Sequence, residues 1–242
     1  MARSPLEPPE GRVALVTGGN RGLGLQIVRA LAEQGMRVVL ASRSVESGRV
    51  AVELLGHLTN RVAVRQLDIT DPASVARLAV WLGRRLGRCD VLVNNAAVLL
   101  EEDDAMATTV NLDVVRRTLE TNLLGTWRLS QAIAPLMRAC RYGRIVNVSS
   151  GLASLASMRR GLPAYRISKG AVNSLTRLLA DELAADGILV NSCCPEPARV
   201  EAGDRYHPVR FSASADTPVW LATLPDDGPT GGFYRERRPI DW

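Results

Sequence analysis

Short apolar runs alternate along the chain with longer stretches whose apolar residues recur at helical spacing. The first run, residues 13–17, stops at a pair of glycines and is followed by an apolar stripe at Leu23, Ile27, Ala30 and Leu31. This pattern predicts a strand, a tight turn and an amphipathic helix. The same alternation predicts further strands over residues 37–40, 62–67, 90–93, 144–148 and 189–193, and helices over residues 45–58, 72–86, 110–138 and 164–184.

Alternating strands and helices of this kind predict the α/β class, with a doubly wound parallel sheet (Rossmann fold) covered by helices on both faces. We expect a single domain over residues 11–242, preceded by a flexible leader over residues 1–10, which contain three prolines. After residue 195 proline, glycine and aspartate are frequent, so we expect loops there and a short final strand near Phe233.

The composition is that of a folded globular protein, because 46% of the 242 residues are hydrophobic and 23% are charged. No apolar run reaches the roughly 18 residues of a membrane helix, and the first ten residues lack the apolar core of a signal peptide. We therefore expect a soluble, cytoplasmic protein with no membrane partner.

The chain has little material for metal or disulfide chemistry. Its four cysteines are scattered or adjacent, and only two histidines are present. These spacings predict reduced thiols and no metal site. The net charge is +5, but the arginines are spread along the chain and aromatic residues make up only 4%, so a mildly basic surface is favoured over a nucleic-acid partner.

A glycine-rich turn, TGGNRGLG at residues 17–24, joins the first predicted strand to the first predicted helix. Glycines let the backbone turn sharply and approach a pyrophosphate at a helix N-terminus. At this place the turn indicates dinucleotide binding, with a merely structural turn as the alternative. The candidate cofactor-binding residues in it are Gly18, Asn20, Arg21, Gly22, Leu23 and Gly24.

The end of the second predicted strand points to the type of dinucleotide. NAD-specific sites carry a carboxylate there for the ribose 2′-hydroxyl, whereas this chain reads Ser42-Arg43. Arg43, together with Arg21, can pair with a 2′-phosphate through charge-assisted hydrogen bonds. The sequence therefore favours NADP(H), the alternative being that both arginines are ordinary solvated charges.

Polar residues also follow the third and fourth predicted strands. Asp68, with Ile69 beside it, follows the third strand, and its carboxylate can accept a hydrogen bond from an adenine amino group or serve only in a turn. The sequence Asn94-Asn95 ends the fourth strand. We expect Asn95 to contact the cofactor, the alternative being an amide that ties neighbouring strand ends together.

Tyr165 and Lys169 are four residues apart in a predicted helix, which places them on one face, one turn apart. Lys169 is the only lysine among 30 basic residues. A compact ammonium group beside a phenol favours the phenolate and lowers the phenol's pKa. Tyr165 is therefore a candidate general acid.

Two further positions carry candidate chemistry. Ser149 and Ser150 follow directly after the strand over residues 144–148, where a hydroxyl can orient a substrate carbonyl. Asn122 lies between apolar neighbours in a helical region, and from its position alone a structural role is as plausible as a catalytic one.

Taken together, these residues make the chain resemble the short-chain dehydrogenase/reductase superfamily from residue 11 to the end. The family's TGxxxGxG loop, adenine-side Asp, NNAG segment, helix Asn, Ser and Tyr-xxx-Lys appear here as residues 17–24, Asp68, residues 94–97, Asn122, Ser150, Tyr165 and Lys169. Within the superfamily, TGGNRGLG with VVLASR looks most like the NADPH-dependent carbonyl reductases.

The resemblance implies a role for each candidate catalytic residue. Ser150, the second serine of its pair, would hold the carbonyl, and Tyr165 would donate the proton. Lys169 would bind the nicotinamide ribose and lower the pKa of Tyr165, so Tyr165 and Lys169 also count as cofactor-binding residues. Asn122 would support a water that links Lys169 to bulk solvent.

The chain departs from the family after the last long strand. The segment Cys194-Pro195-Glu196-Pro197-Ala198 has Glu196 where the family usually has Gly, and Val200 stands near the place of a Thr. The resemblance makes Pro195 and Ala198 candidate cofactor contacts, whereas an inward-pointing Glu196 would weaken binding of a polyanion. Residues 201–214 are few and polar, so we expect an open substrate pocket.

The sequence thus predicts an NADPH-dependent oxidoreductase that reduces a ketone or aldehyde to an alcohol, reversibly. The alternative is a non-catalytic NADP(H)-binding redox sensor or scaffold, suggested by Glu196 and Val200. The expected partner is a small-molecule carbonyl or alcohol substrate. A monomer and a homodimer remain equally open.

Overall fold

The computed structural model describes residues 11–195 and 208–242, with the backbone alone for residues 208–213. Eight strands form one sheet in the order β3-β2-β1-β4-β5-β6-β7-β8, parallel except for the last pair. The strands are β1 (Val13–Thr17), β2 (Arg37–Ser42), β3 (Val62–Gln66), β4 (Val91–Asn94), β5 (Gly143–Val148), β6 (Ile188–Cys193), β7 (Phe233–Arg235) and β8 (Arg238–Pro239). The predicted α/β class and doubly wound sheet are confirmed.

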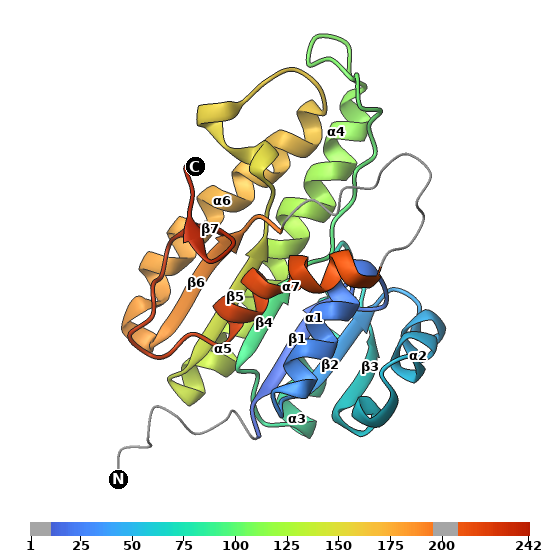
Figure 1. Ribbon diagram of the computed structural model, residues 1–242, viewed down its shortest axis with the longest axis vertical. Coiled ribbons are helices and arrows are strands. Elements are labelled where there is room, and N and C mark those ends of the chain that lie inside the picture. Colours follow the sequence, from blue (N-terminus) through green and yellow to red (C-terminus); the bar gives the residue numbers. More distant parts are fainter. Residues whose placement is uncertain (1–10, 196–207) are drawn as a thin grey trace.

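Helices cover both faces of this sheet (Figure 1). The α-helices are α1 (Gly22–Glu33), α2 (Val45–Glu53), α3 (Pro72–Arg85), α4 (Leu112–Leu119), α5 (Thr126–Cys140), α6 (Pro163–Leu183) and α7 (Pro208–Ala222). Helices α1, α2 and α7 contribute to one apolar cluster, and α3, α5 and α6 to another. Alternate residues of β1 enter the two clusters, because successive side chains of a strand point to opposite faces.

Three predicted elements were wrong in extent or type. The second helix ends at Glu53 and gives way to a 3₁₀ segment, η1 (Gly56–Arg61), at whose start Gly56 has φ +61°. The long helix over residues 110–138 is divided by a π-helical segment, η2 (Glu120–Gly125). After residue 195, where loops were expected, α7 packs against α1 through residues that include Ala215 and Val219. The small and polar residues of α7 and its internal Pro218 hide the helical period.

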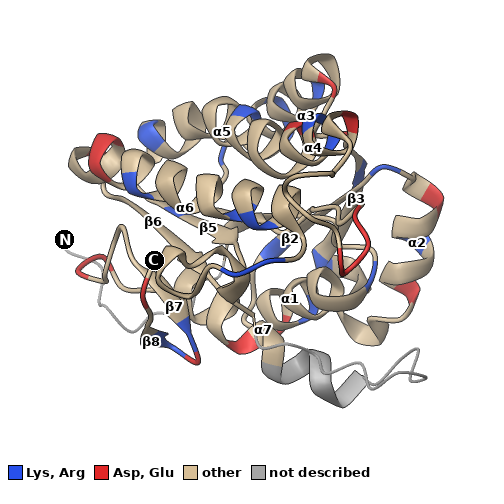
Figure 2. Cartoon of the chain, turned by 90° about the horizontal axis from the view of Figure 1, so that it is seen from above, with Lys and Arg blue, Asp and Glu red and all other residues tan. Residues whose placement is uncertain are grey.

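Charge is spread over this framework (Figure 2). Basic and acidic residues alternate over helices on both sides of the sheet, and that view shows no single basic face. None of the helices in the described ranges combines the length and apolar character of a membrane-spanning segment. Within the same residues, no group of three or more His, Cys, Asp and Glu side chains is placed to hold a metal ion. The four cysteines are free thiols.

A row of buried polar side chains crosses the sheet and fixes α6 on it. Asn94 of β4 donates to Asn147 of β5 at 2.8 Å, and Asn147 donates to the Thr176 hydroxyl of α6 at 2.8 Å. The Thr176 and Ser192 hydroxyls are 2.7 Å apart, and Asn94 also donates to Ser130 of α5 at 3.2 Å. Because each group is buried, each needs its partner in the row.

This row predicts unequal effects for two buried asparagines. Asn147→Leu leaves Asn94 and Thr176 short of a partner, so we expect a loss of about 3 kcal/mol in the free energy of unfolding. Asn173→Leu is the control: the Asn173 side-chain amide is buried and has no hydrogen-bond partner among the described residues, so its replacement is neutral or stabilising. Urea unfolding of both variants tests this, and equal losses would contradict it.

Candidate active site

The glycine-rich turn brings the N-terminus of α1 to the carboxyl end of β1. Gly18 has φ +62° and Gly22 has φ +52°, a region that glycine enters without steric cost. At Gly24 an added Cβ would lie 2.3 Å from the Gly18 carbonyl oxygen and 2.6 Å from the Asn95 amide nitrogen. The turn therefore needs glycine for its backbone conformation and for the close approach of helix and strand.

This turn forms one wall of a cleft of about 940 Å³ at the carboxyl ends of β1, β2, β3 and β4. The cleft suits an elongated ligand with phosphate groups, because its lining combines the α1 N-terminus with arginine side chains. Ten of the predicted cofactor-binding residues line it: Gly18, Asn20, Arg21, Gly22, Leu23, Gly24, Arg43, Asp68, Ile69 and Asn95.

The charges around the adenosine side of this cleft fit a 2′-phosphate. Arg21 and Arg43 both line it, and neither forms a salt bridge with a described carboxylate. Ser42 occupies the end of β2, and its hydroxyl donates to the Ser44 carbonyl at 2.6 Å. Asp68 accepts hydrogen bonds from the Thr70 hydroxyl and N–H, which lower the pKa of the Asp68 carboxyl. Arg43 therefore supplies positive charge where an NAD site would carry a carboxylate, and Arg21 adds a second positive charge to the same cleft.

Asn95 ties the end of β4 to the glycine-rich turn. Its amide nitrogen donates to the Thr17 carbonyl at 2.8 Å and to the Gly18 carbonyl at 3.3 Å. The Thr17 hydroxyl accepts from the backbone N–H groups of Asn95 and Ala96. The side chain thus lines the cleft and also joins strand ends, so both readings of Asn95 have a structural counterpart.

A second group of predicted residues meets beyond the end of β5. Tyr165 and Lys169 lie one turn apart on α6, and the Ser150 side chain lies near enough to the Tyr165 phenol to lower its pKa. Ser150 caps a short 3₁₀ segment, η3 (Gly151–Ala153). Ser149 is buried and its hydroxyl donates to the Lys169 carbonyl, which leaves Ser150 as the serine that faces the tyrosine.

Burial dominates the ionisation of this pair. Desolvation raises the pKa of Tyr165, and the nearby Ser150 hydroxyl opposes that rise. Lys169 is 3% exposed, and burial lowers the pKa of its ammonium group to about 8. Its Nζ donates to the Val148 carbonyl at 2.7 Å and lies 5.8 Å from the centre of the Tyr165 ring. The net pKa shift of Tyr165 is therefore upward, opposite to the lowering predicted from Lys169.

Asn122 lies in the π-helical segment and holds two other elements. Its Oδ1 accepts from the Val98 N–H at 2.8 Å, and its Nδ2 donates to the Val98 carbonyl at 2.9 Å and to the Ser168 hydroxyl at 3.0 Å. Asn122 thus links the loop after β4 to α6 through hydrogen bonds. A π-helical turn of this kind often marks a functional site.

The structure also places residues that the sequence patterns did not indicate. Arg117 of α4 lines the cleft, but it is one of many arginines and carries no distinguishing signal. Glu101, in the loop after β4, is buried against the start of α6, 63 residues further along the chain at Ala164. Of the remaining predicted contacts, Pro195 ends the described segment after β6, and Ala198 lies outside the described residues, as do Glu196 and Val200.

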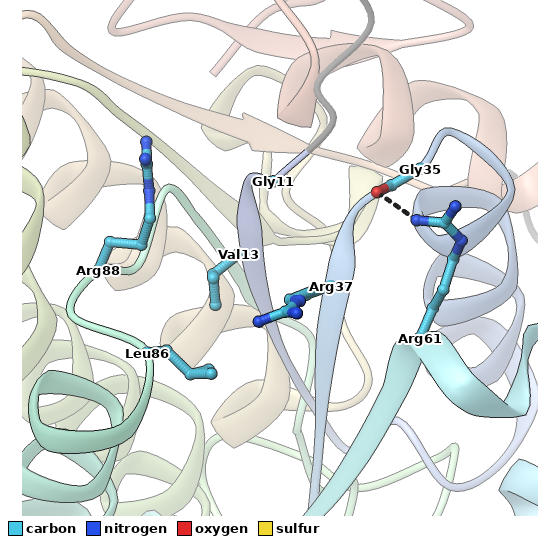
Figure 3. Close-up of a pocket in the computed structure, with 7 residues that line it drawn as sticks. All are labelled: Gly11, Val13, Gly35, Arg37, Arg61, Leu86 and Arg88. Atoms are coloured by element: carbon cyan, nitrogen blue, oxygen red, sulfur yellow. Dashed lines mark hydrogen bonds between the residues drawn. The ribbon is translucent and has the colours of Figure 1, made fainter.

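A smaller pocket of about 410 Å³ lies at the opposite, amino-terminal end of the strands (Figure 3). Two of its three arginines already have partners: Arg61 donates to the Gly35 carbonyl at 2.9 Å, and Arg88 pairs with buried Asp90. None of the predicted catalytic or cofactor-binding residues that the structure describes lines this pocket. The larger cleft, which ten predicted cofactor-binding residues line, is therefore the candidate cofactor site, and Asn122, Ser150, Tyr165 and Lys169 are not among its lining residues.

A cofactor cleft beside a Ser, Tyr and Lys group defines the class of dinucleotide-dependent oxidoreductases. Comparison with known proteins agrees: the pattern of the short chain dehydrogenase family matches residues 12–207. The chain belongs to the short-chain dehydrogenase/reductase family.

Individual relatives cover almost the whole chain. Carbonyl reductase (NADPH) 1 of Sus scrofa is 33% identical, with 96% of this chain and 94% of the relative aligned. Carbonyl reductase (NADPH) 3 of Homo sapiens is 34% identical, with 96% and 98% aligned. A metagenomic short-chain oxidoreductase solved in complex with NADP has a TM-score of 0.79 and 30% identity, over 93% of this chain and 96% of that one. A menthone neomenthol reductase from Mentha piperita has a TM-score of 0.78 and 28% identity, over 93% and 98%.

Family membership and the arginines of the cleft agree on the cofactor. Arg43 follows β2, where an NAD site carries a carboxylate, and Arg21 of the glycine-rich turn lines the same cleft. The protein is an NADP(H)-dependent short-chain oxidoreductase.

The single lysine allows a direct test of the buried ammonium group. In protein labelled with ¹³C-lysine, we expect the one side-chain resonance of Lys169 to titrate near pH 8, because burial lowers its pKa to about 8. An exposed lysine titrates near about 10.4. Unfolding the protein in urea is the control and should return the resonance to that range; titration above pH 10 in the folded protein would contradict the burial effect.

Proposed function

We propose that the protein reduces the carbonyl group of a ketone or aldehyde to an alcohol, reversibly, with a proton from Tyr165. NADPH supplies the hydride when it is bound. The observation that carries the proposal is that the Ser150 side chain lies near the Tyr165 phenol at the carboxyl edge of the sheet, with Lys169 one helical turn away and its Nζ 5.8 Å from the Tyr165 ring centre.

Each residue of this group has a role that follows from its position. The Ser150 hydroxyl orients the substrate carbonyl, and Tyr165 donates a proton to its oxygen. The raised pKa of Tyr165 keeps the phenol protonated near neutral pH, as a proton donor requires. Lys169 binds the nicotinamide ribose, and its positive charge stabilises the phenolate that remains after proton transfer.

Other predicted residues bind the dinucleotide or position the elements that carry the catalytic group. Asn122 fixes the loop at Val98 and, through Ser168, the first turns of α6. The ten cleft residues bind the dinucleotide, and Pro195 and Ala198 are proposed to complete that site. The substrate is a small carbonyl or alcohol compound. A cytoplasmic location and a monomeric or homodimeric state stay predictions.

The decisive variant is Tyr165→Phe, which removes the proton donor and keeps the ring. We expect the rate of NADPH oxidation with a panel of ketones, aldehydes and quinones to fall about 100-fold or more, while the Kd for NADPH stays within about twofold. Tyr142→Phe is the matched control, because Tyr142 lies at the amino-terminal edge beside Arg12. Unchanged turnover in Tyr165→Phe would refute the mechanism, and NADPH binding without turnover in the wild type would favour the sensor.

Arg43→Ala tests the choice of cofactor. Loss of a charge-assisted hydrogen bond to a 2′-phosphate should raise the Kd for NADPH about 10-fold to 100-fold and leave the Kd for NADH unchanged. Arg49→Ala, at an exposed pair with Glu46 on α2, should change neither value. Fluorescence titration of both cofactors decides the matter, and wild-type protein that binds NADH as tightly as NADPH would overturn the assignment.

A further inference from the structure

Helix α6, which carries Tyr165 and Lys169, begins without a cap of its own. Its N-cap residue is Leu162, which has φ +52° and no side-chain hydrogen bond to the helix. The next residue, Pro163, has no backbone N–H. The first-turn N–H groups without an intrahelical partner are therefore those of Ala164 and Tyr165, because Arg166 already bonds to the Leu162 carbonyl.

Glu101 supplies the missing cap from a distant part of the chain. Its Oε1 accepts the Ala164 N–H at 2.9 Å and its Oε2 accepts the Tyr165 N–H at 2.8 Å. The residue is 8% exposed. One carboxylate thus satisfies both free donors, and its negative charge lies at the positive end of the helix dipole.

The loop that carries Glu101 also borders the cofactor cleft. Leu100, directly before Glu101, lines the cleft, and so does Val98. Val98 is fixed by Asn122 through its N–H and its carbonyl. Residues 98–101 are therefore held at one end by Asn122 and at the other end by α6.

The approach of this loop to α6 is close. At Gly161, where φ is +88°, an added Cβ would lie 2.8 Å from the Asp103 carbonyl oxygen. On the other side, Arg166 Nε donates to the Gly161 carbonyl at 2.7 Å. The two loops are thus packed backbone to backbone, which places Glu101 within reach of the helix start.

We propose that Glu101 is a positioning residue, whose carboxylate fixes the first turn of α6 and thereby the Tyr165 phenol against Ser150 and the cofactor cleft. This inference rests on the proposed function, since it assigns Tyr165 its chemistry. Small displacements of a reacting group are costly: about 1 Å can reduce the rate about 100-fold. Because the cap bonds the backbone N–H of Tyr165 itself, its loss acts directly at the reacting residue.

Accepting both backbone N–H groups at this position requires a carboxylate. A glutamine of the same size has one acceptor oxygen and one NH₂ group, which would face one of the two N–H donors. Glu102, the next residue, is exposed and has no side-chain bond to α6. The neighbouring glutamate therefore serves as a matched control of equal charge.

The kinetic test compares Glu101→Gln with Glu102→Gln. We expect Glu101→Gln to lower kcat about 10-fold, with KM and Kd for NADPH within about twofold of the wild type, and Glu102→Gln to change none of these. A residue that only supported the fold would lower the amount of active protein without such a split between kcat and cofactor binding. If Glu101→Gln has a kcat within twofold of the wild type while Tyr165→Phe is inactive, the inference is wrong and the proposed function stands.

Amide hydrogen exchange tests the cap without any substrate. In the wild type, the amides of Ala164 and Tyr165 should exchange at least 10-fold more slowly than first-turn amides that have no capping acceptor. The Glu101→Gln substitution should remove most of this protection from the same two amides. If the wild type reduces no carbonyl compound, the proposed function fails, and this measurement still decides whether Glu101 holds the helix. If the Glu101 variant does not fold, rapid exchange of the two amides in the wild type would by itself refute the cap.

Discussion

Everything at the active end of the molecule depends on how α6 is held on the sheet. The row Asn94, Asn147, Thr176 and Ser192 joins β4, β5, α6 and β6 through hydrogen bonds between buried groups. Hydrogen bonds are directional, whereas apolar packing is not. The row therefore fixes the register of α6 against the strands and also stabilises its packing on them. Thr176 lies about two turns beyond Lys169, so the row of buried polar groups also fixes the position of the candidate catalytic residues on α6.

The same burial that fixes these side chains also sets their ionisation. A phenol and an ammonium group taken out of water both favour their neutral forms, which raises the pKa of Tyr165 and lowers that of Lys169. In the reduction proposed above, the protonated phenol is the useful form, so desolvation would prepare the acid rather than oppose it. In that proposal the charge of Lys169 matters after proton transfer, when a phenolate has formed beside it. Lys169 would then stabilise the phenolate product of the transfer more than it lowers the resting pKa of Tyr165.

The sequence predicts well those features that local pattern determines. The strands and the glycine turn follow from alternation and from Gly18, Gly22 and Gly24, where backbone conformation or close approach excludes a side chain. Tyr165 and Lys169 follow from helical spacing. The helix α7 could not be predicted, because its small and polar residues and Pro218 weaken the period, and its burial depends on α1. The π-helical turn at Asn122 could not be predicted either, and its Asn122 forms two hydrogen bonds to Val98 that the local sequence does not reveal.

The role of Glu101 also depends on a tertiary contact, but the sequence indicates that such a contact is needed. A helix that opens with Leu-Pro-Ala-Tyr has no side chain able to cap it, so two N–H donors at its start require an acceptor from elsewhere if they are buried. Local sequence can therefore show that a remote acceptor is needed, while only the fold can show which residue supplies it. In this chain the supplier comes from the loop that also lines the cofactor cleft. The start of α6 and the wall of the cofactor cleft are consequently one continuous hydrogen-bonded unit, in which neither can move far without the other.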